Sequence, residues 1–252
     1  TVAARPGEAG PRAGAPLARS IRDMFDRIAP SYDALNRALS LGIDQRWRRR
    51  AIACLGDLEN RRVLDLCAGT LDVASLIALK FPSARLFAVD FSRAMLKKGR
   101  GARSCRETRL LACQADALCL PVHDAAFSAA ICAFGVRNLD DTERGLREVA
   151  RVLEPGGRFA VLEFFRPETR RQKLFHRWYN RTVLPGVGAW VSGDKDAYRY
   201  LAASMERFLS IDEFAALAAR CGFAVVSASA LFPGVATLVV LDKLERDGLV
   251  PS

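Results

Sequence analysis

Two acidic residues that each follow a short apolar run are the residues of this sequence best placed to do chemistry. Asp65 leads into a small-residue loop at 67–70, and Asp90 ends a second apolar run. A strand, a tight loop, a helix and a second strand in this order form a nucleoside-binding unit, in which the second carboxylate accepts both ribose hydroxyls. The spacing therefore predicts a nucleoside-containing ligand, against the alternative of an ordinary tight turn.

The sequence of the loop distinguishes between two kinds of nucleoside-containing ligand. A dinucleotide site uses several glycines to bring backbone amides against a pyrophosphate, whereas this loop keeps only Gly69. Asp72 adds a negative charge at the start of the following helix, which repels phosphate and suits a cationic ligand. S-adenosylmethionine carries a sulfonium and an ammonium group, and it is the cofactor we expect.

Length and composition bound the class of protein. The chain of 252 residues, half of them hydrophobic, is long enough for one large α/β domain and short for two. Residues 1–19 are rich in Ala, Gly, Pro and Arg and lack the apolar core of a signal peptide, so we expect a disordered lead-in. One domain then covers 20–252, with a helical insertion or lid at 166–208, and no apolar run is long enough to span a bilayer.

Cysteine usage and charge limit the compartments, metals and partners to be expected. Seven cysteines are scattered without metal-site spacing and the two histidines lie far apart, so we expect free thiols, a cytoplasmic protein and no metal. The formal net charge of +10 favours an anionic partner: nucleic acid, acidic lipid or an acidic substrate. A general preference for arginine gives the same charge without any partner, so charge alone does not decide.

Alternating strands and helices must position these residues. Strands are expected near 62–65, 86–90, 109–113, 129–134 and 158–163, with helices near 72–81, 92–103 and 142–153. This order predicts a parallel sheet with helices on both faces and a ligand at the carboxyl ends of the strands.

The flanking segments differ from this alternation. A helix at 20–39 is interrupted by Pro30, and Asp44 caps a second helix that ends near Leu55. A turn at 154–157 launches a strand. A helix at 211–221 and β-rich runs at 223–230 and 235–241 predict a final antiparallel hairpin at the sheet edge.

Three further segments are too particular to be generic: 24–33, 133–138 and 196–201. Together they resemble the C-methyltransferases of menaquinone and ubiquinone biosynthesis, over nearly everything from 24 to 241. The resemblance implies a class I methyltransferase fold: a seven-stranded, mostly parallel sheet with an antiparallel C-terminal strand. It also implies methyl transfer from S-adenosylmethionine to a prenylated quinol ring. Demethylmenaquinol is the first expectation and 2-methoxy-6-polyprenyl-1,4-benzoquinol the alternative.

The resemblance carries cofactor contacts onto Thr70, Asp90, Asp116 and Ala117, beside the loop residues Asp65 and Gly69 and the strand-end Ala133. Asp116 has an alternative role as a turn or helix-cap residue. The family loop usually has a second glycine where this chain has Leu71. Either the turn tolerates leucine with a negative φ, or cofactor affinity is reduced.

Catalysis on an aromatic carbon requires the ring hydroxyl to lose its proton, and the protein must align the reactants and stabilise a phenolate. Arg137 and Asn138 lie just past a strand end and are the first candidates, and relatives add a tyrosine that matches Tyr32. Arg137 stays protonated, so it holds the phenolate or polarises a water. The alternatives are a surface salt bridge for Arg137 and a helix N-cap for Asn138.

The quinol pocket and its approach are expected in the last third of the chain. Tyr198 and Tyr200 line the pocket or pack in the core, and His176 is a general base by type or an interfacial histidine. The segment 166–184 interleaves basic and aromatic residues, so it predicts peripheral contact with the inner face of the cell membrane. A packed amphipathic lid and a homodimer contact through this helix stay open.

Two other classes of protein are weighed against this interpretation. The basic charge prompts an RNA or protein methyltransferase. Methyltransferases of nitrogen atoms often carry an Asn/Asp-Pro-Pro-aromatic motif where this chain has 134–137, and no RNA-binding module is appended. We therefore expect no nucleic-acid partner. Leu71 prompts a degenerate homologue that binds no cofactor.

Overall fold

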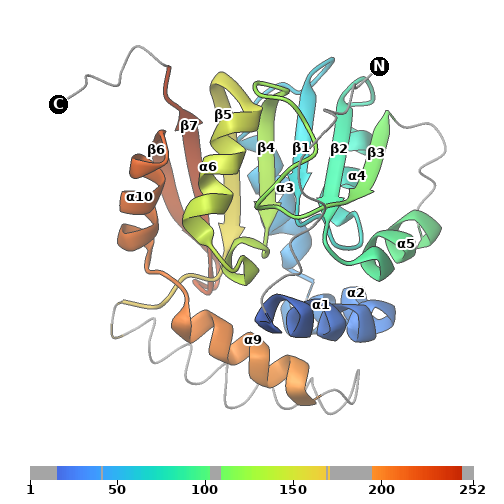
Figure 1. The fold of residues 1–252 in the computed structure, drawn as a ribbon. Helices are drawn as coiled ribbons and strands as arrows, with labels where there is room; N and C mark the ends of the chain where they lie inside the picture. Colours follow the sequence, from blue (N-terminus) through green and yellow to red (C-terminus); the bar gives the residue numbers. More distant parts are fainter. Residues whose placement is uncertain (1–15, 41, 103–108, 169, 171–194, 246–252) are drawn as a thin grey trace.

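The computed structural model describes residues 16–40, 42–102, 109–168, 170 and 195–245. Its seven strands form one sheet in the order β3-β2-β1-β4-β5-β7-β6 (Figure 1). The strands are β1 (Arg62–Leu66), β2 (Arg85–Asp90), β3 (Leu110–Gln114), β4 (Phe127–Ala133), β5 (Leu153–Glu163), β6 (Phe223–Leu231) and β7 (Ala236–Lys243).

The strand directions confirm the expected fold class. The pairs β1–β2, β1–β4, β2–β3 and β4–β5 are parallel, whereas β7 runs antiparallel to both β5 and β6. The final hairpin therefore does not simply extend the edge, because β7 inserts between β5 and β6. Parallel central strands are buried on both faces, which explains why β1 and β4 are mostly apolar and have little exposed surface.

Helices cover both faces of the sheet, as predicted (Figure 1). On one face α3 (Asp44–Ala53), α4 (Asp72–Lys80) and α5 (Arg93–Ala102) contribute Trp47, Ile77 and Leu96 to one core cluster. On the other face α6 (Thr142–Val152) and α10 (Ile211–Arg220) contribute Leu146 and Phe214 to a second cluster. None of the described helices is both long and apolar enough to cross a membrane.

A separate set of helices lies across the carboxyl-terminal edge of the strands (Figure 1). It comprises α1 (Pro16–Ile28), the 3-10 turn η1 (Ala29–Ser31), α2 (Tyr32–Ser40) and α9 (Lys195–Arg207). Pro30 lies within η1, which confirms that it interrupts the first helical segment. Met24, Ile28 and Ala29 pack with Met95 of α5 and hold these helices against the sheet edge.

Two local predictions are wrong. Asp44 does not cap α3: the N-cap is Ile43, without a side-chain bond, and Asp44 is the first helical residue. The buried Asp44 carboxylate instead accepts from Ser40 Oγ at 2.9 Å and pairs with Arg48 at 3.5 Å. The turn at 154–157 falls inside β5, where the register with β4 shifts and Gly156 has φ +71°. At Asp44 the ion pair with Arg48 overrides the local capping signal.

Candidate functional site

A cavity of about 440 Å³ lies where the carboxyl ends of the strands meet the edge helices. Its lining includes Cys67 and Gly69 after β1, Asp90 and Phe91 at β2, Asp116, Ala117 and Leu118 after β3, Ala133, Phe134, Gly135 and Asn138 after β4, and Arg22, Phe25 and Tyr32 from α1 and α2. The prediction that a ligand site forms at this edge is thus matched by a cavity. The cavity also joins residues more than a hundred positions apart, such as Tyr32 and Asn138.

Asp90 is fixed in the cavity wall by two backbone amides. Its carboxylate accepts from the N–H of Gly69 and of Ser92, each at 2.8 Å. Burial raises the pKa of Asp90 to about 6, although these backbone hydrogen bonds lower it. The group is ionised at neutral pH and keeps lone pairs toward the cavity, so it is able to accept from a pair of ribose hydroxyls.

The loop between β1 and α4 folds back sharply, because Cys67, Gly69 and Leu71 all have positive φ. Leu71 has φ +64° and ψ +28°, so the expected alternative of a negative φ is wrong. Its side chain is fully buried in the core, and its Cγ lies 2.9 Å from where a Cβ on Gly99 would sit. Leu71 is not among the residues that line the cavity, so its bulk is directed into the core beside α5 and does not narrow the site.

Asp65 and Thr70 stand behind the cavity wall and are not among its lining residues. The Asp65 carboxylate accepts from the N–H of Ala74 at 3.0 Å, in the first turn of α4, and burial raises its pKa to about 7. Thr70 Oγ1 donates to Asp33 at 2.5 Å. Both residues shape the loop, and their direct contact with a cofactor stays a prediction.

The wall formed after β3 carries Asp116 and Ala117. Asp116 Oδ1 accepts from the N–H of Leu118 at 2.8 Å, so the turn role foreseen as an alternative is present. The residue also lines the cavity, and its other carboxylate oxygen has no hydrogen bond to the described residues. One oxygen holds the turn and the other is available to an adenine amino group, beside the apolar Ala117 and Leu118.

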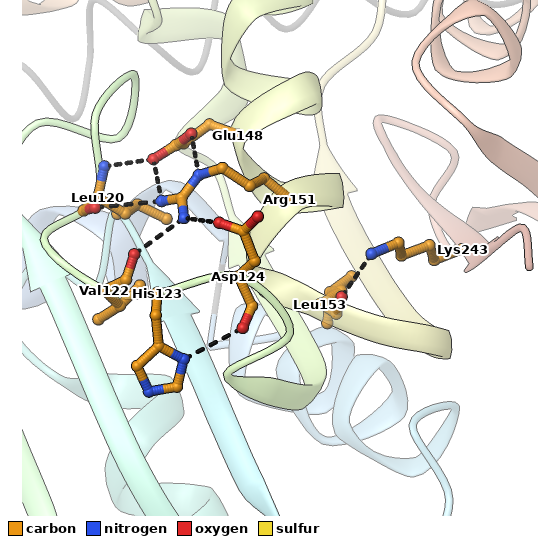
Figure 2. A network of polar contacts seen from close by, with 8 residues as sticks. All are labelled: Leu120, Val122, His123, Asp124, Glu148, Arg151, Leu153 and Lys243. Atoms are coloured by element: carbon orange, nitrogen blue, oxygen red, sulfur yellow. Dashed lines mark hydrogen bonds and ion pairs between the residues drawn. The ribbon is translucent and has the colours of Figure 1, made fainter. Parts of the chain in front are cut away.

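A polar network on α6 holds this wall in place (Figure 2). Arg151 donates to the carbonyl of Val122 at 2.9 Å and pairs with Asp124 and Glu148, each at 2.7 Å. Glu148 accepts in turn from the N–H of Leu120 at 2.6 Å. The segment that follows Leu118 is therefore tied to a helix on the face of the sheet, which pre-organises the turn at Asp116.

The Arg137 side chain is buried. Arg137 does form a salt bridge, but this bridge is buried and not at the surface, where the alternative places it. Its Nη1 donates to Glu163 at 2.6 Å and to the carbonyl of Phe134 at 2.8 Å, and its Nε donates to Ser204 at 3.3 Å. Burial lowers the pKa of Arg137, but Glu163, Tyr32 and Tyr200 together raise it further, so the pKa lies above its usual value and the guanidinium stays cationic. Arg137 is not among the cavity-lining residues, and its predicted catalytic role stays a prediction.

Asn138 and Tyr32 reach the cavity from opposite parts of the chain. Asn138 ends the turn η3 (Val136–Asn138) and does not cap α6, since Asp141 accepts from the N–H of Arg144 there. Its Oδ1 accepts from the Tyr200 hydroxyl at 3.0 Å. Burial raises the pKa of Tyr32, although Asn36, Arg48 and Arg137 lower it, so Tyr32 keeps its phenolic proton at neutral pH.

Several predicted residues cannot be placed at the site. His176 and residues 171–184 lie outside the described residues, and so does the side chain of Tyr198, whose backbone is part of α9. Tyr200 on the same helix is placed; it does not line the cavity itself, but its hydroxyl donates to Asn138, which does. Ala133, at the end of β4, lines the cavity as expected.

Sequence reasoning missed Glu163, Phe25 and Arg22. Glu163 is fully buried and accepts from the Arg137 side chain and from the backbone N–H groups of Arg137 and Phe164. The signal was present, because Glu163 ends an apolar run as Asp65 and Asp90 do. Phe25 lies in the segment 24–33 that carries the resemblance, but nothing in that segment indicated that it lines the cavity, and Arg22 gave no signal. The reason is that α1 approaches the cavity only in the tertiary structure.

The polar groups at this site fit S-adenosylmethionine better than a phosphate-bearing nucleotide. The first-turn amide of α4 that a phosphate would use is already bound by the Asp65 carboxylate, and the buried Asp72 adds a second acid at this helix end. Three acidic residues, Asp90, Asp116 and Asp140, line the cavity together with two arginines, Arg19 and Arg22. The acidic side chains outnumber the basic ones, which suits a ligand with positive charge. The residues present therefore match the cofactor expected from the loop.

Comparison with known proteins agrees with this geometry. The model of the ubiE/COQ5 methyltransferase family matches residues 16–241. Demethylmenaquinone methyltransferase of Thermus thermophilus is 43% identical over 87% of this chain and 100% of its own length. The ubiquinone/menaquinone biosynthesis C-methyltransferase UbiE of Geobacter sulfurreducens is 43% identical over 88% of each chain.

Solved structures share the fold at low identity. The geranyl diphosphate C-methyltransferase of Streptomyces coelicolor, determined with S-adenosyl-L-homocysteine, has a TM-score of 0.68 at 14% identity and covers 92% of this chain and 99% of its own. A possible histamine N-methyltransferase of Thermotoga maritima has a TM-score of 0.61 at 22% identity and covers 88% and 99%. These likenesses concern the architecture alone, whereas the family model and the close relatives cover nearly the whole described chain. The chain belongs to the ubiE/COQ5 methyltransferase family and is an S-adenosylmethionine-dependent methyltransferase.

Proposed function

We propose that this protein methylates a ring carbon of a prenylated quinol, with demethylmenaquinol as the first substrate and 2-methoxy-6-polyprenyl-1,4-benzoquinol as the alternative. The observation that carries the proposal is the mixed lining of one cavity, to which we assign two parts, one for each ligand. Asp90 and Asp116 suit a nucleoside at one part, while Tyr32, Phe134 and Asn138 offer aromatic surface and hydrogen bonds at another. Relatives in Thermus thermophilus, Deinococcus radiodurans and Thermotoga maritima are named demethylmenaquinone methyltransferase, which supports the naphthoquinol.

S-adenosylmethionine supplies an electrophilic methyl group when bound. Asp90 orients the ribose through its two hydroxyls, and Asp116 with Ala117 orients the adenine. The backbone of Cys67 and Gly69 shapes the space for the methionine part. These residues would hold the cofactor against the cavity wall, so the wall would align the two reactants.

The second part must stabilise a phenolate on the quinol. Tyr32 keeps its proton because burial raises its pKa, so its hydroxyl acts as a hydrogen-bond donor to the phenolate oxygen and not as the base. Arg137 contributes a buried positive charge whose field reaches Tyr32. It also holds the carbonyl of Phe134, and so fixes the strand end that carries Asn138. Arg137 thus acts on the quinol ring indirectly, by holding the loop after β4 and by the effect of its positive charge on Tyr32.

Partners and location remain part of the proposal. A prenylated substrate resides in the bilayer, so we place the protein at the inner face of the membrane as a peripheral protein. The basic segment 166–184 supports such contact by its composition, and a homodimer through the same segment is a second use of it. Neither an RNA substrate nor a degenerate site is favoured, because the cavity retains both Asp90 and Asp116 and Leu71 stays out of it.

The test is to incubate the protein with methyl-labelled S-adenosylmethionine and reduced demethylmenaquinone in detergent, with the demethyl benzoquinol in parallel. Label on the naphthoquinol ring supports the first proposal, and label on the benzoquinol alone selects the alternative. Tyr32→Phe is expected to slow turnover, because a hydrogen bond to the charged phenolate contributes about 1.5–3 kcal/mol. Cofactor affinity should stay within about two-fold, because that bond is made to the quinol and not to the cofactor. Cofactor binding without label on either ring refutes the proposed acceptor.

A further inference from the structure

One face of α3 carries three arginines without partners. Arg46, Arg49 and Arg50 are spaced by three and four residues, so they share a face, opposite the buried Trp47 and Arg48. All three are exposed, and within the described chain none makes a side-chain hydrogen bond or ion pair. Other described arginines, such as Arg137, Arg151 and Arg158, form ion pairs. We call these three residues the α3 basic face.

An exposed aromatic ring is anchored to the helix that carries the α3 basic face. Phe232 lies in the loop between β6 and β7, and 81% of its surface is exposed. Its backbone carbonyl accepts from Trp47 Nε1 at 2.9 Å, which ties the loop to α3. No other phenylalanine or tryptophan among the described residues is exposed to solvent as a large apolar side chain. A ring held this way in water has no role in the packing of the domain.

The same aromatic cluster connects Phe232 to the cavity. The Trp47 ring lies 6.2 Å from the ring of Phe134 and 6.5 Å from that of Phe164. Phe134 lines the cavity, on the side proposed for the quinol. The surface formed by the α3 basic face and Phe232 is therefore only two aromatic rings from the substrate space.

We propose that the α3 basic face and Phe232 form a docking surface for an anionic lipid bilayer. Unpaired arginines match the negative potential of acidic headgroups, and a projecting aromatic ring inserts at the interface. Nucleic acid matches the charge, but single strands are bound by several aromatic rings that stack successive bases, and this surface has one. None of the four residues of this surface belongs to the segment 166–184, and the proposal does not depend on which quinol is methylated.

The test measures sedimentation of the full chain with vesicles of phosphatidylcholine, with and without phosphatidylglycerol. In the triple variant Arg46→Gln, Arg49→Gln, Arg50→Gln, we expect partitioning to anionic vesicles to fall by about 100-fold, since each arginine near the surface contributes about five-fold, or about 1 kcal/mol. Phe232→Ser is expected to reduce partitioning to both kinds of vesicle by about ten-fold, because the inserted ring contributes apolar burial.

Matched controls separate this surface from bulk charge. Arg61→Gln, Arg85→Gln, Arg144→Gln removes the same charge from exposed arginines elsewhere, and Leu111→Ser removes an exposed side chain from β3 at the opposite sheet edge. Both controls are expected to bind vesicles nearly as the unmodified protein does, with unchanged thermal midpoints and cofactor affinity. Equal loss in the two triple variants overturns the proposal.

A second comparison addresses nucleic acid. If the α3 triple variant loses binding to single-stranded RNA by far more than it loses binding to anionic vesicles, the surface is a nucleic-acid site and the proposal is wrong. The assays contain no quinol, so their failure leaves the proposed methyl transfer intact. Failure of methyl transfer likewise leaves the docking surface standing.

Discussion

Leucine in the left-handed conformation of the cofactor loop leads to an unusual expected order of stability. At Leu71, with φ +64°, a glycine variant should be more stable than an alanine variant. Left-handed backbone costs an L-residue about 1–2 kcal/mol and costs glycine nearly nothing. Leu71→Ala keeps that cost and loses a fully buried side chain, whereas Leu71→Gly loses the side chain and removes the cost.

The magnitudes follow from burial and backbone strain together. Emptying the buried leucine site in Leu71→Ala should lower the free energy of unfolding by about 3 kcal/mol, within the range seen for such changes. Leu71→Gly should be less destabilised than Leu71→Ala by about 1 kcal/mol, which corresponds to about 2–4 °C in the thermal midpoint for a chain of this size. Both variants should bind S-adenosylmethionine within about two-fold of the unmodified protein, because Leu71 does not line the cavity.

Urea unfolding gives the stabilities, and titration calorimetry with S-adenosylmethionine gives the affinities. Ala78→Gly within α4 is the matched control, since in a regular helix glycine is less stable than alanine by about 1 kcal/mol. The reasoning is refuted if Leu71→Ala is the more stable of the two Leu71 variants. It also fails if Leu71→Gly tightens cofactor binding ten-fold, since the side chain would then obstruct the site.

Three further predictions concern the buried charges. Asp90→Asn should weaken S-adenosylmethionine binding by about 10-fold or more, because hydrogen bonds to a charged group contribute about 1.5–3 kcal/mol. In the unmodified protein the affinity for S-adenosylmethionine should fall as pH drops through about 6, where Asp90 gains a proton. Calorimetry on the variant and on the unmodified protein at several pH values checks both expectations. An affinity that does not change with pH contradicts the role of Asp90. Burial raises the pKa of Asp65 from 3.8 to about 7. Between these two pH values the folded protein therefore binds a proton that the unfolded chain lacks. The free energy of unfolding consequently falls as pH rises through this range. Asp65→Asn should flatten that fall in urea unfolding between pH 4 and 7, and an unchanged slope would show that Asp65 is ionised when folded. Glu163→Gln leaves the Arg137 cation poorly compensated and should lower stability by about 3 kcal/mol, while the pair Arg137→Met with Glu163→Leu should recover stability but not turnover. Recovery of turnover in the double variant would show that the pair is only structural.

Local order along the chain follows from local sequence. Strands β1, β2 and β4 and helices α4 and α6 lie within a few residues of their predicted bounds, because apolar runs, period and capping are local properties. Asp90 is also a local prediction: an acid that ends a parallel strand must lie at the ligand edge of the sheet. Glu163 carries the same signal, and its partner Arg137 is far away in sequence, so the signal alone did not assign its role.

The sequence by itself determined the fold class, the strand-end carboxylates and the family, since motif spacing and alternating periodicity are read without knowing distances. Only the tertiary structure decided that Arg137 is buried against Glu163, that Tyr32 meets Asn138 at one cavity, and that Leu71 turns into the core with positive φ. The physical reason is that these features depend on strand order and helix docking. The order β1-β4-β5 places loops from distant parts of the chain at one edge, and the chain itself records no such proximity.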